Sequence, residues 1–249
     1  MEQWKNRIAV VTGASAGIGA AIAKDLVKAG MIVIGLARRV DLVEALKNDL
    51  PEDLRKNLHS VQCDLTNEAD IILVFSWIVE KYNGIDILIN NAGIGPGNTE
   101  LIASDNSEAI RKILDTNVLG LIFCTREAYK SMEKHGRNSH VVHINSVSGH
   151  KVFCNLAAPS RNMYSPSKFA VTAITEIHRQ EFIRSKHHIK VTSISPGLVK
   201  TELPGKDMLE KHSAVLEPED VSQSVLYVLG TPPHVQVHEL TIKPFGEVF

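Results

Sequence analysis

Short apolar runs alternate with longer amphipathic segments along the whole chain. Several of the runs are nearly continuous Val, Ile and Leu, which is typical of strands buried on both faces of a parallel sheet. Polar or glycine-rich stretches separate them from the segments that follow. The pattern predicts strands at 7–12, 31–37, 60–64, 85–90, 140–146, 190–195 and 237–242.

The segments between these strands repeat apolar residues at helical spacing. Ile18, Ile22 and Leu26 share one face, and Gly30 follows at a natural helix stop. Strands that alternate with helices need right-handed crossovers, which place helices on both faces of a sheet. We therefore expect residues 1–249 to form a single α/β domain, a doubly wound Rossmann fold with a seven-stranded parallel sheet. The predicted helices are 18–29, 67–82, 106–135, 163–186 and 219–229.

Composition and charge narrow the range of functions. The 249 residues carry a formal net charge of −1, which gives no electrostatic reason to expect nucleic acid. No apolar run approaches the roughly 20 residues of a membrane span, and the polar start does not resemble a signal peptide. Three widely spaced cysteines fit buried thiols in a reducing compartment, so a cytoplasmic location is expected. The histidines lack partners at metal-ligand spacing, so no metal is expected.

A glycine-rich turn follows the first predicted strand and opens the first predicted helix. Gly13, Gly17 and Gly19 are spaced G-x-x-x-G-x-G. Gly13 permits a tight turn, and the other two let backbone and helix come close to a pyrophosphate. Because a helix N-terminus also offers free N–H groups to an anion, the turn predicts a dinucleotide site.

The end of the second strand indicates which dinucleotide binds. An acidic residue that would bind the ribose 2′-hydroxyl of NAD(H) is missing there, and Arg38 and Arg39 follow Ala37. Guanidinium groups pair with a 2′-phosphate in a forked, charge-assisted way, so NADP(H) is the expected cofactor. Two alternatives stay open: the arginines are ordinary loop charges, or Asp41 is a displaced ribose ligand rather than a helix cap.

Tyr164 and Lys168 lie one helical turn apart, and Ser146 precedes the tyrosine by 18 residues. A phenol with its ordinary pKa of about 10 is a poor proton carrier at neutral pH. A lysine on the same helix face favours the phenolate and brings the tyrosine toward working pH. A serine hydroxyl at a nearby strand end can then hold the carbonyl or alcohol oxygen that exchanges the proton.

Taken in order, these motifs resemble those of the short-chain dehydrogenase/reductase family over essentially the full length of the chain. The resemblance adds Asn90-Asn91-Ala92-Gly93, Asp64, Asn117 and Pro196-Gly197 with Thr201 to the residues above. Within the family, the chain is most similar to the branch of insect farnesol dehydrogenases and animal dehydrogenase/reductase member 11 proteins. That branch uses NADP(H) and acts on terpenoid alcohols or on steroid and other carbonyls.

The resemblance implies a role for each matching residue. Ser146 would polarise the substrate oxygen and Tyr164 would act as acid and base. Lys168 would bond the nicotinamide ribose, and Asn117 would hold a water that relays protons to Lys168. Pro196 to Leu198 would pack near the nicotinamide. The remaining expected cofactor contacts are Ser15, Ala16, Ile18, Asp64, Leu65, Asn91, Ala92, Gly93, Gly197, Val199 and Thr201.

Two departures from the family pattern affect the catalytic residues. Asn145 precedes Ser146 where the family often has a second serine, and Ser148 is a nearby competitor for the same role. Pro166 lies between Tyr164 and Lys168, where it would disrupt a helix interior. The proline is tolerable if the helix begins only a residue or two before it.

Two segments beyond the strand ends are expected to form the substrate walls, because ligands of open α/β sheets bind there. Both are aliphatic and lack paired arginines that would clamp an anion, so a small apolar alcohol or ketone is expected. The segment 197–213 is also a candidate lid. The expected wall residues are Val152, Phe153, Met163, Leu198, Leu203 and Met208, with Ser146 at the reacting oxygen.

The leading hypothesis is therefore an NADP-dependent oxidoreductase that transfers a hydride between nicotinamide and an apolar alcohol or carbonyl. A farnesol-type alcohol is favoured, and a ketosteroid or small diketone remains the alternative. A catalytically silent cofactor-binding scaffold is a more remote alternative, because fold alone does not prove activity. In the family, helices like 106–135 and 163–186 pack as a four-helix interface, so a homodimer or homotetramer is expected.

Overall fold

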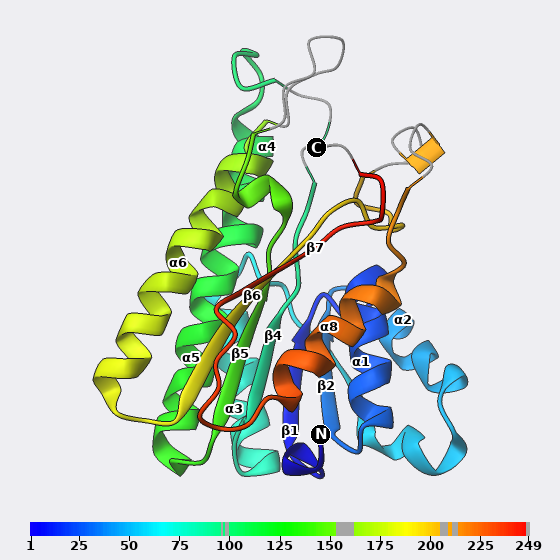
Figure 1. Ribbon diagram of the computed structural model, residues 1–249, viewed down its shortest axis with the longest axis vertical. Coiled ribbons are helices and arrows are strands. Elements are labelled where there is room, and N and C mark those ends of the chain that lie inside the picture. Colours follow the sequence, from blue (N-terminus) through cyan, green and yellow to red (C-terminus); the bar gives the residue numbers. More distant parts are fainter. Residues whose placement is uncertain (96, 98–99, 153–161, 205–208, 211–213, 248–249) are drawn as a thin grey trace.

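One parallel sheet of seven strands forms the centre of the molecule (Figure 1). The computed structural model describes residues 1–95, 97, 100–152, 162–204, 209–210 and 214–247. The strand order is β3-β2-β1-β4-β5-β6-β7, which confirms the predicted doubly wound fold. The strands are β1 (Ile8–Thr12), β2 (Ile32–Ala37), β3 (Leu58–Gln62), β4 (Ile87–Asn90), β5 (Ser139–Ile144), β6 (Ile189–Pro196) and β7 (Glu239–Ile242).

Helices cover both faces of this sheet (Figure 1). One layer consists of α1 (Gly17–Lys28), α2 (Val40–Ala45) and α8 (Pro218–Gly230). The opposite layer consists of α3 (Glu68–Tyr82), α4 (Ser107–Leu114), α5 (Gly120–His135) and α6 (Tyr164–Ser185). Short helical turns complete the described chain: η1 (Glu2–Trp4), η2 (Leu46–Asp49), η3 (Glu52–Asn57), the π-helical η4 (Asp115–Leu119) and η5 (Val147–Gly149).

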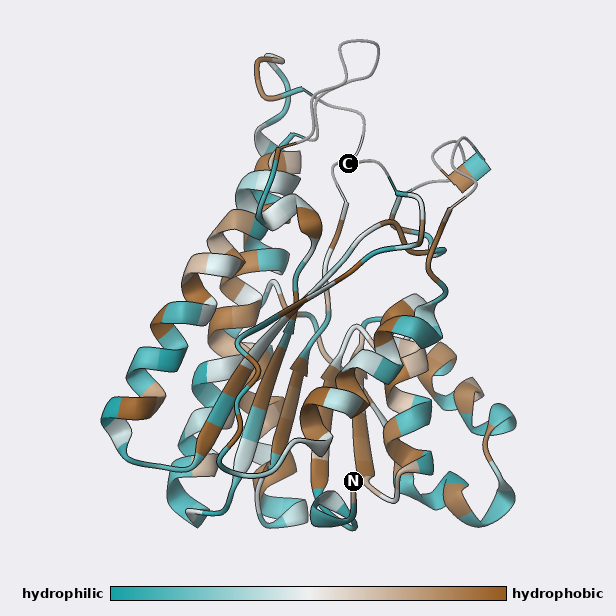
Figure 2. Cartoon of the chain, viewed as in Figure 1, coloured by the Kyte–Doolittle hydropathy of each residue, from teal (hydrophilic) through white to brown (hydrophobic). Residues whose placement is uncertain are grey.

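The alternating sides of β1 explain why its sequence is apolar without interruption. Ala9 and Val11 pack in the cluster that includes α1 and α8, whereas Ile8 and Val10 pack in the cluster that includes α3 and α5. Successive side chains of a strand point to opposite faces, so a strand covered on both sides has no polar face. Figure 2 shows the central strands as the most hydrophobic part of the chain.

Local signals fix most of the helix boundaries close to the predicted ones. The Asn67 side chain accepts from the N–H groups of Ala69 and Asp70 and so caps α3. Gly30, just past α1, has a φ of +88°, as expected after a helix end. Pro166 is the third residue of α6, where a missing N–H costs little. Within the described residues, no helix combines the length and apolar character needed to cross a membrane.

Two elements differ from the prediction. The expected helix 106–135 is interrupted between α4 and α5 by the π-helical turn η4. Helix α2, for which the periodicity gave no separate helix, begins at Val40, so Asp41 lies in its first turn rather than at its cap. Both differences are short local adjustments that leave the alternation of strands and helices unchanged.

The sheet reverses its winding between β1 and β4. The chain leaves β1 toward β2 on one side, and β4 pairs with the other side of β1 and continues toward β5. The connections that leave β1 and β4 therefore diverge at the carboxyl ends of these strands. A crevice opens at such a switch point, which is where open α/β sheets bind ligands.

Candidate active site

A cavity of about 1040 Å³ opens at this switch point. Its walls come from the carboxyl ends of β1, β2, β4, β5 and β6 and from the segments that follow them. Most of the predicted site residues meet there, although they are spread over nearly 200 positions of the sequence. The predicted residues that line the cavity are Gly13, Ser15, Ala16, Gly17, Ile18, Arg38, Arg39, Asp64, Leu65, Asn91, Ala92, Gly93, Ser146, Tyr164, Lys168, Pro196, Gly197, Leu198, Val199, Thr201 and Leu203.

The glycine-rich turn leaves backbone, rather than side chains, facing the cavity. Gly13 has a φ of +67°, and a Cβ there would lie 2.8 Å from the Cα of Ala92. Gly17 has a φ of +54°, and a Cβ there would lie 2.9 Å from Thr201 Cγ2. Gly19 does not line the cavity: a Cβ at Gly19 would lie 2.3 Å from the carbonyl oxygen of Gly13. Gly19 therefore serves close packing of helix on loop, and Gly13 and Gly17 shape the surface offered to a ligand.

Hydrogen bonds lock the end of β4 to the end of β1. The Asn91 amide donates to the carbonyl oxygens of Thr12 at 2.9 Å and Gly13 at 3.2 Å. In return, Thr12 Oγ1 accepts from the backbone N–H groups of Asn91 and Ala92, both at 3.0 Å. Thr12 was not among the predicted site residues, because its contribution depends on the neighbouring strand. The pair holds the two diverging loops at a fixed separation.

Charged groups surround the part of the cavity beyond β2 and β3. Arg38 and Arg39 are exposed, and Arg39 Nη2 lies 3.4 Å from Glu202 Oε2. Asp64 Oδ1 accepts from the N–H of Thr66 at 3.0 Å and from its hydroxyl at 2.8 Å. These bonds, led by the backbone N–H of Thr66 and assisted by the charge of Arg38, lower the pKa of Asp64. Asp41 does not line the cavity, so the structure gives the alternative of a displaced ribose ligand no support.

Ser146 lies just beyond β5, at the start of the turn η5. It is 8% exposed, and its Oγ accepts from the N–H of Ser148 at 3.1 Å. The hydroxyl keeps its own hydrogen available, because an N-cap role uses only the oxygen as an acceptor. Ser148 also lines the cavity and is more deeply buried, at 1% exposed. The two serines therefore face the same space.

Tyr164 and Lys168 occupy the first turns of α6. Both are buried, at 6% exposed, and Lys168 Nζ lies 5.8 Å from the centroid of the Tyr164 ring. The ammonium group donates to the carbonyl oxygen of Ile144, at the end of β5, at 2.9 Å. Burial lowers the pKa of Lys168 to about 8. A group with that pKa is still mostly protonated at neutral pH, so a positive charge stands beside the phenol.

Asn117 lies within the π-helical turn η4 and does not line the cavity. Its Nδ2 donates to the carbonyl oxygen of Ile94 at 3.1 Å and to Ser167 Oγ at 3.1 Å. Its Oδ1 accepts from the N–H of Ile94 at 2.9 Å. Both amide hydrogens are thus used to tie the loop after β4 to α6. In the structure, the Asn117 side chain connects these two segments next to the cavity. The predicted proton relay through Asn117 remains a prediction.

The predicted substrate walls divide into three groups. Leu198, 9% exposed, and Leu203, 41% exposed, line the cavity. Val152, 64% exposed, and Met163, the N-cap residue of α6, do not line it. Phe153 and Met208 lie outside the described residues, as does part of the proposed lid 197–213.

Glu247 is the lining residue that sequence reasoning missed most completely. It lies in the chain beyond β7, and its side chain reaches the segment after β6. No local motif surrounds it in the sequence, because its place depends on where the end of the chain returns. Ile94 and Thr116 were also missed as lining residues.

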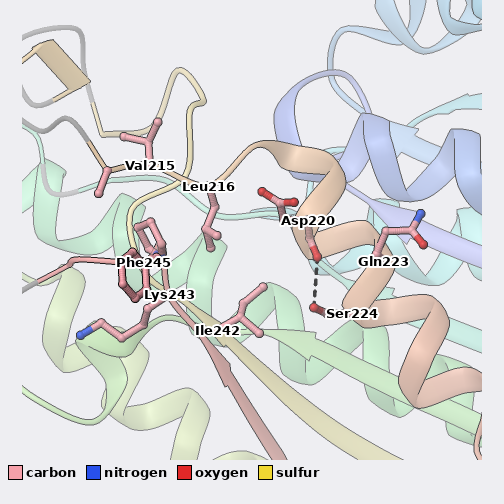
Figure 3. A pocket seen from close by; sticks show the side chains of 10 residues that line it. Val215, Leu216, Asp220, Gln223, Ser224, Ile242, Lys243 and Phe245 are labelled. Carbon is pink, nitrogen blue, oxygen red and sulfur yellow. Dashed lines mark hydrogen bonds between the residues drawn. The ribbon is translucent and has the colours of Figure 1, made fainter.

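A second hollow of about 450 Å³ lies between the start of α8 and the chain that follows β7 (Figure 3). Leu216, Ile242 and Phe245 contribute apolar side chains, and Asp220 and Gln223 of α8 contribute polar ones (Figure 3). None of the predicted site residues lines it. The motifs that carry chemistry therefore gather in the larger cavity.

The described residues contain no group of three or more His, Cys, Asp or Glu side chains that could hold a metal ion. Cys63 and Cys124 are free and buried, as the cysteine pattern predicted, and Cys154 lies outside the described part of the chain. Burial raises the pKa of the Cys63 thiol to about 12. A thiol with that pKa is a poor nucleophile, although Cys63 lines the cavity.

A comparison with protein families decides the relationship. The family model described as short chain dehydrogenase matches residues 7–211, which includes the glycine-rich turn, Ser146, Tyr164 and Lys168. The chain belongs to the short-chain dehydrogenase family. This finding confirms the family predicted from the ordered motifs, and it makes the protein an oxidoreductase.

Relatives extend the match over the whole short-chain dehydrogenase. The farnesol dehydrogenase of Aedes aegypti is 57% identical over 249 residues, which cover 100% of both chains. The dehydrogenase/reductase SDR family member 11 of Mus musculus is 43% identical over 262 residues, which cover 100% of this chain and 98% of its own. A serine dehydrogenase, solved in a closed form complexed with NADP⁺, matches with a TM-score of 0.79 and 31% identity over 94% of each chain. These matches confirm the predicted branch and fold.

Proposed function

We propose that this short-chain dehydrogenase uses NADP(H) to oxidise an apolar alcohol, with a farnesol-type terpenoid alcohol as the favoured substrate. One observation carries the proposal: Ser146, Tyr164 and the buried Lys168 line the same cavity as the glycine-rich turn and the two arginines. The arginines follow β2 and the catalytic residues follow β5, three strand positions away, or roughly 14 Å at ordinary strand spacing. That separation suits an extended dinucleotide with its adenosine and nicotinamide at opposite ends.

The residues present fit NADP(H). Gly13 and Gly17 keep the space above the turn free of side chains, because a Cβ at either position would collide with its neighbours. The N-terminus of α1 faces this space and favours a pyrophosphate. Arg38 and Arg39, exposed beside it, would hold the 2′-phosphate. The NADP⁺ of the serine dehydrogenase and the branch resemblance support the same cofactor.

The bound cofactor supplies the hydride acceptor or donor at the nicotinamide ring. In alcohol oxidation, Tyr164 as phenolate would take the hydroxyl proton of the substrate, whose carbon would give its hydride to the bound cofactor. The positive charge of Lys168 favours that phenolate, and the Ser146 hydroxyl donates to the substrate oxygen. In the reverse direction, Tyr164 returns the proton to the carbonyl oxygen.

The substrate class follows from the apolar side of the cavity and from the relatives. Leu198, Leu203 and Ile94 line it, together with the carboxylate of Glu247 from the chain beyond β7. An aliphatic chain fits such a surface, whereas an anionic substrate would lack a cationic clamp. The farnesol dehydrogenase that is 57% identical over both full lengths supports a prenyl alcohol.

The first test is a panel of initial rates, followed by nicotinamide absorbance, with the purified protein. NADP⁺ and NAD⁺ are each paired with farnesol, and NADPH and NADH with farnesal, a ketosteroid and a small diketone. We expect the fastest turnover with farnesol and NADP⁺. Preference for a ketone with NADPH would instead establish the second candidate, a carbonyl reductase of the kind its family branch includes.

The second test separates chemistry from binding. Tyr164→Phe removes the phenolic oxygen but keeps the ring in its buried position, so we expect turnover to fall by about 10²-fold or more. Binding of NADPH, measured by fluorescence titration, is expected to stay nearly unchanged. Turnover at the wild-type rate would refute the role of Tyr164, and no turnover by the wild type on any substrate would favour the cofactor-binding scaffold.

Self-association is part of the same proposal. Phe169, Ile177 and Ile183 of α6 are 41%, 52% and 62% exposed, an unusual amount of apolar surface for one helix face to leave in water. We propose that α5 and α6 pair with those of a second copy in a homodimer or homotetramer. Light scattering that gives the mass of a single chain would contradict this. The free thiols of Cys63 and Cys124 support a reducing, cytoplasmic location.

A further inference from the structure

The end of the chain turns back into the cavity. Beyond β7, Pro244 is buried, Gly246 has a φ of +89° and the N–H of Glu247 donates to the carbonyl oxygen of Pro244 at 3.1 Å. This left-handed backbone conformation at Gly246 reverses the direction of the chain. A residue with a side chain would be strained in that conformation, whereas glycine is not. Phe245 is 103% exposed and lines the second hollow instead (Figure 3). The turn therefore directs Glu247, and not its aromatic neighbour, toward the cavity.

The segment after β6 is shaped to receive the Glu247 side chain. Its Oε2 accepts from the backbone N–H of Leu198 at 3.3 Å. A Cβ at Gly197 would lie 2.0 Å from the same oxygen and 2.8 Å from the carboxyl carbon. Gly197 thus leaves this space to the Glu247 carboxylate, which a side chain at position 197 would have to displace. The Gly197 N–H donates to the carbonyl oxygen of Ile242 at 2.8 Å, which fixes the two segments side by side.

The second carboxylate oxygen of Glu247 has no partner. Its Oε1 is buried and makes no hydrogen bond with any described residue. Burying a charged oxygen without a donor or a cation is costly, so such an atom indicates that something else completes its surroundings. Glu247 lines the cavity that also holds Tyr164 and Lys168. A ligand bound in that cavity would therefore be in a position to interact with the unpaired Oε1 of Glu247.

We propose that Glu247 binds the nicotinamide end of the cofactor and makes the site prefer NADP⁺ over NADPH. The inference rests on the proposed function, which places the nicotinamide beside Tyr164, in the cavity that Pro196, Gly197 and Leu198 also line. The nicotinamide ring is cationic in NADP⁺ and neutral in NADPH, while the phosphates are the same in both. A carboxylate near the ring therefore attracts the oxidised form selectively, and its free oxygen can accept from the carboxamide NH₂ in either form.

This preference suits an alcohol dehydrogenase. Alcohol oxidation needs the oxidised cofactor bound, and a site that binds NADP⁺ more tightly than NADPH also releases the reduced cofactor more readily. Glu202, another acidic residue that lines the cavity, lies beside Arg39 and the expected 2′-phosphate. The 2′-phosphate near Glu202 is the same in NADP⁺ and in NADPH, so the charge of Glu202 cannot favour one of the two forms.

The test compares dissociation constants of NADP⁺ and NADPH for the wild type and for Glu247→Gln, measured by fluorescence titration and calorimetry without substrate. Glutamine keeps an acceptor for the Leu198 N–H and so keeps the turn, but it removes the charge. We expect the ratio Kd(NADP⁺)/Kd(NADPH) to rise about tenfold, as the loss of one nearby partly screened charge predicts. The rise should come mainly from weaker NADP⁺ binding.

Glu202→Gln is the matched control, because it makes the same chemical change in the same cavity. It is expected to shift both dissociation constants by the same factor and so leave their ratio unchanged. Glu247→Ala removes the side-chain carboxylate and leaves no acceptor in its place, and it should reproduce the change in ratio. Circular dichroism and the melting temperature of each variant show whether it is folded.

The outcomes separate the inference from the function on which it rests. A wild type that binds neither NADP⁺ nor NADPH would overturn the proposed function itself. A wild type that binds both, with an unchanged ratio in Glu247→Gln and in Glu247→Ala, would overturn the role of Glu247 alone. Equal weakening of both forms would also overturn it, since it would mean that Glu247 only packs the turn.

Discussion

The cavity holds positive charge in two opposite environments. Lys168 is 6% exposed and donates to the carbonyl oxygen of Ile144, whereas the Arg39 side chain is 53% exposed and faces Glu202 at 3.4 Å. The same unit charge acts strongly on its neighbours in a buried site and weakly in water, because the effective dielectric differs several-fold. The two ends of the site therefore use positive charge for different purposes.

On the proposed function, the buried charge would control reactivity and the exposed charges would control selection. Burial lowers the pKa of Lys168 to about 8, and its ammonium group lies beside the Tyr164 ring. Arg38 and Arg39 are exposed, and they would act on a ligand that brings its own phosphate. A change at Lys168 should thus reduce turnover, whereas a change at the arginines should alter which cofactor binds.

The largest effect is expected from Lys168→Met, which removes the buried charge but keeps much of the volume. Turnover should fall by about 10²- to 10⁴-fold, because Tyr164 loses the charge that favours its phenolate. Lys200→Met is the control, since Lys200 is exposed, pairs with Glu217 at 3.0 Å and lies outside the cavity lining. Equal turnover of Lys168→Met and Lys200→Met would mean that the buried charge of Lys168 matters no more for catalysis than an exposed charge.

The next largest effect concerns cofactor choice. Replacing Arg38 and Arg39 together by Ala should lower the ratio of kcat/KM for NADP⁺ over NAD⁺ by about 100-fold, since each charge-assisted hydrogen bond contributes ~1.5 kcal/mol or more. The kcat with NAD⁺ should change little. If both cofactors lose the same factor, the arginines support the loop and do not read the 2′-phosphate.

A smaller effect is expected on stability as pH changes. The folded pKa of Lys168, about 8, is below its ordinary 10.5, so the unfolded chain holds the proton more tightly between these values. The cost of burying the charge is fully present below pH 8 and is relieved as pH rises toward 10.5. The wild type should gain about 1 kcal/mol in free energy of unfolding over Lys168→Met between pH 7 and pH 9. Urea unfolding measures this difference between the two proteins. The same difference at pH 7 and at pH 9 would contradict a buried ammonium group at Lys168.

The smallest effect is expected at the exposed pair. Glu202→Gln frees Arg39 from a carboxylate, but exposed ion pairs contribute only ~0–1 kcal/mol, so NADP⁺ and NADPH should each bind about twofold more tightly. Calorimetric titration at low and physiological salt measures this change. A tenfold or larger change would mean that the pair is less screened than its exposure indicates, and it would reduce the contrast with Lys168.

Predictions from sequence succeeded where the signal was local. The strands of the sheet were recognised because strands covered on both faces have no polar side, and Gly13, Gly17 and Gly30 stand where turns and helix ends require them. Tyr164 and Lys168 were found because one helical turn fixes their relation. The start of α6 two residues before Pro166 resolved the one local conflict in that segment.

Predictions from sequence could not place side chains whose position depends on distant parts of the chain. Val152 and Met163 were expected to form substrate walls from their apolar character, and the structure places them outside the cavity lining. The Asn117 amide joins Ile94 and Ser167 across 23 and 50 positions, and the proton relay expected of it stays a prediction. Glu247 carried no signal at all.

The sequence by itself determined the fold class, the dinucleotide turn and the trio of Ser146, Tyr164 and Lys168, because hydrophobic periodicity and short-range spacing specify them. Only the tertiary structure decided that Lys168 is buried with a lowered pKa, that Arg39 faces Glu202, and that the C-terminal turn delivers Glu247 to the catalytic end. These properties arise from contacts between segments that meet only when the sheet and its loops close, so no local pattern encodes them.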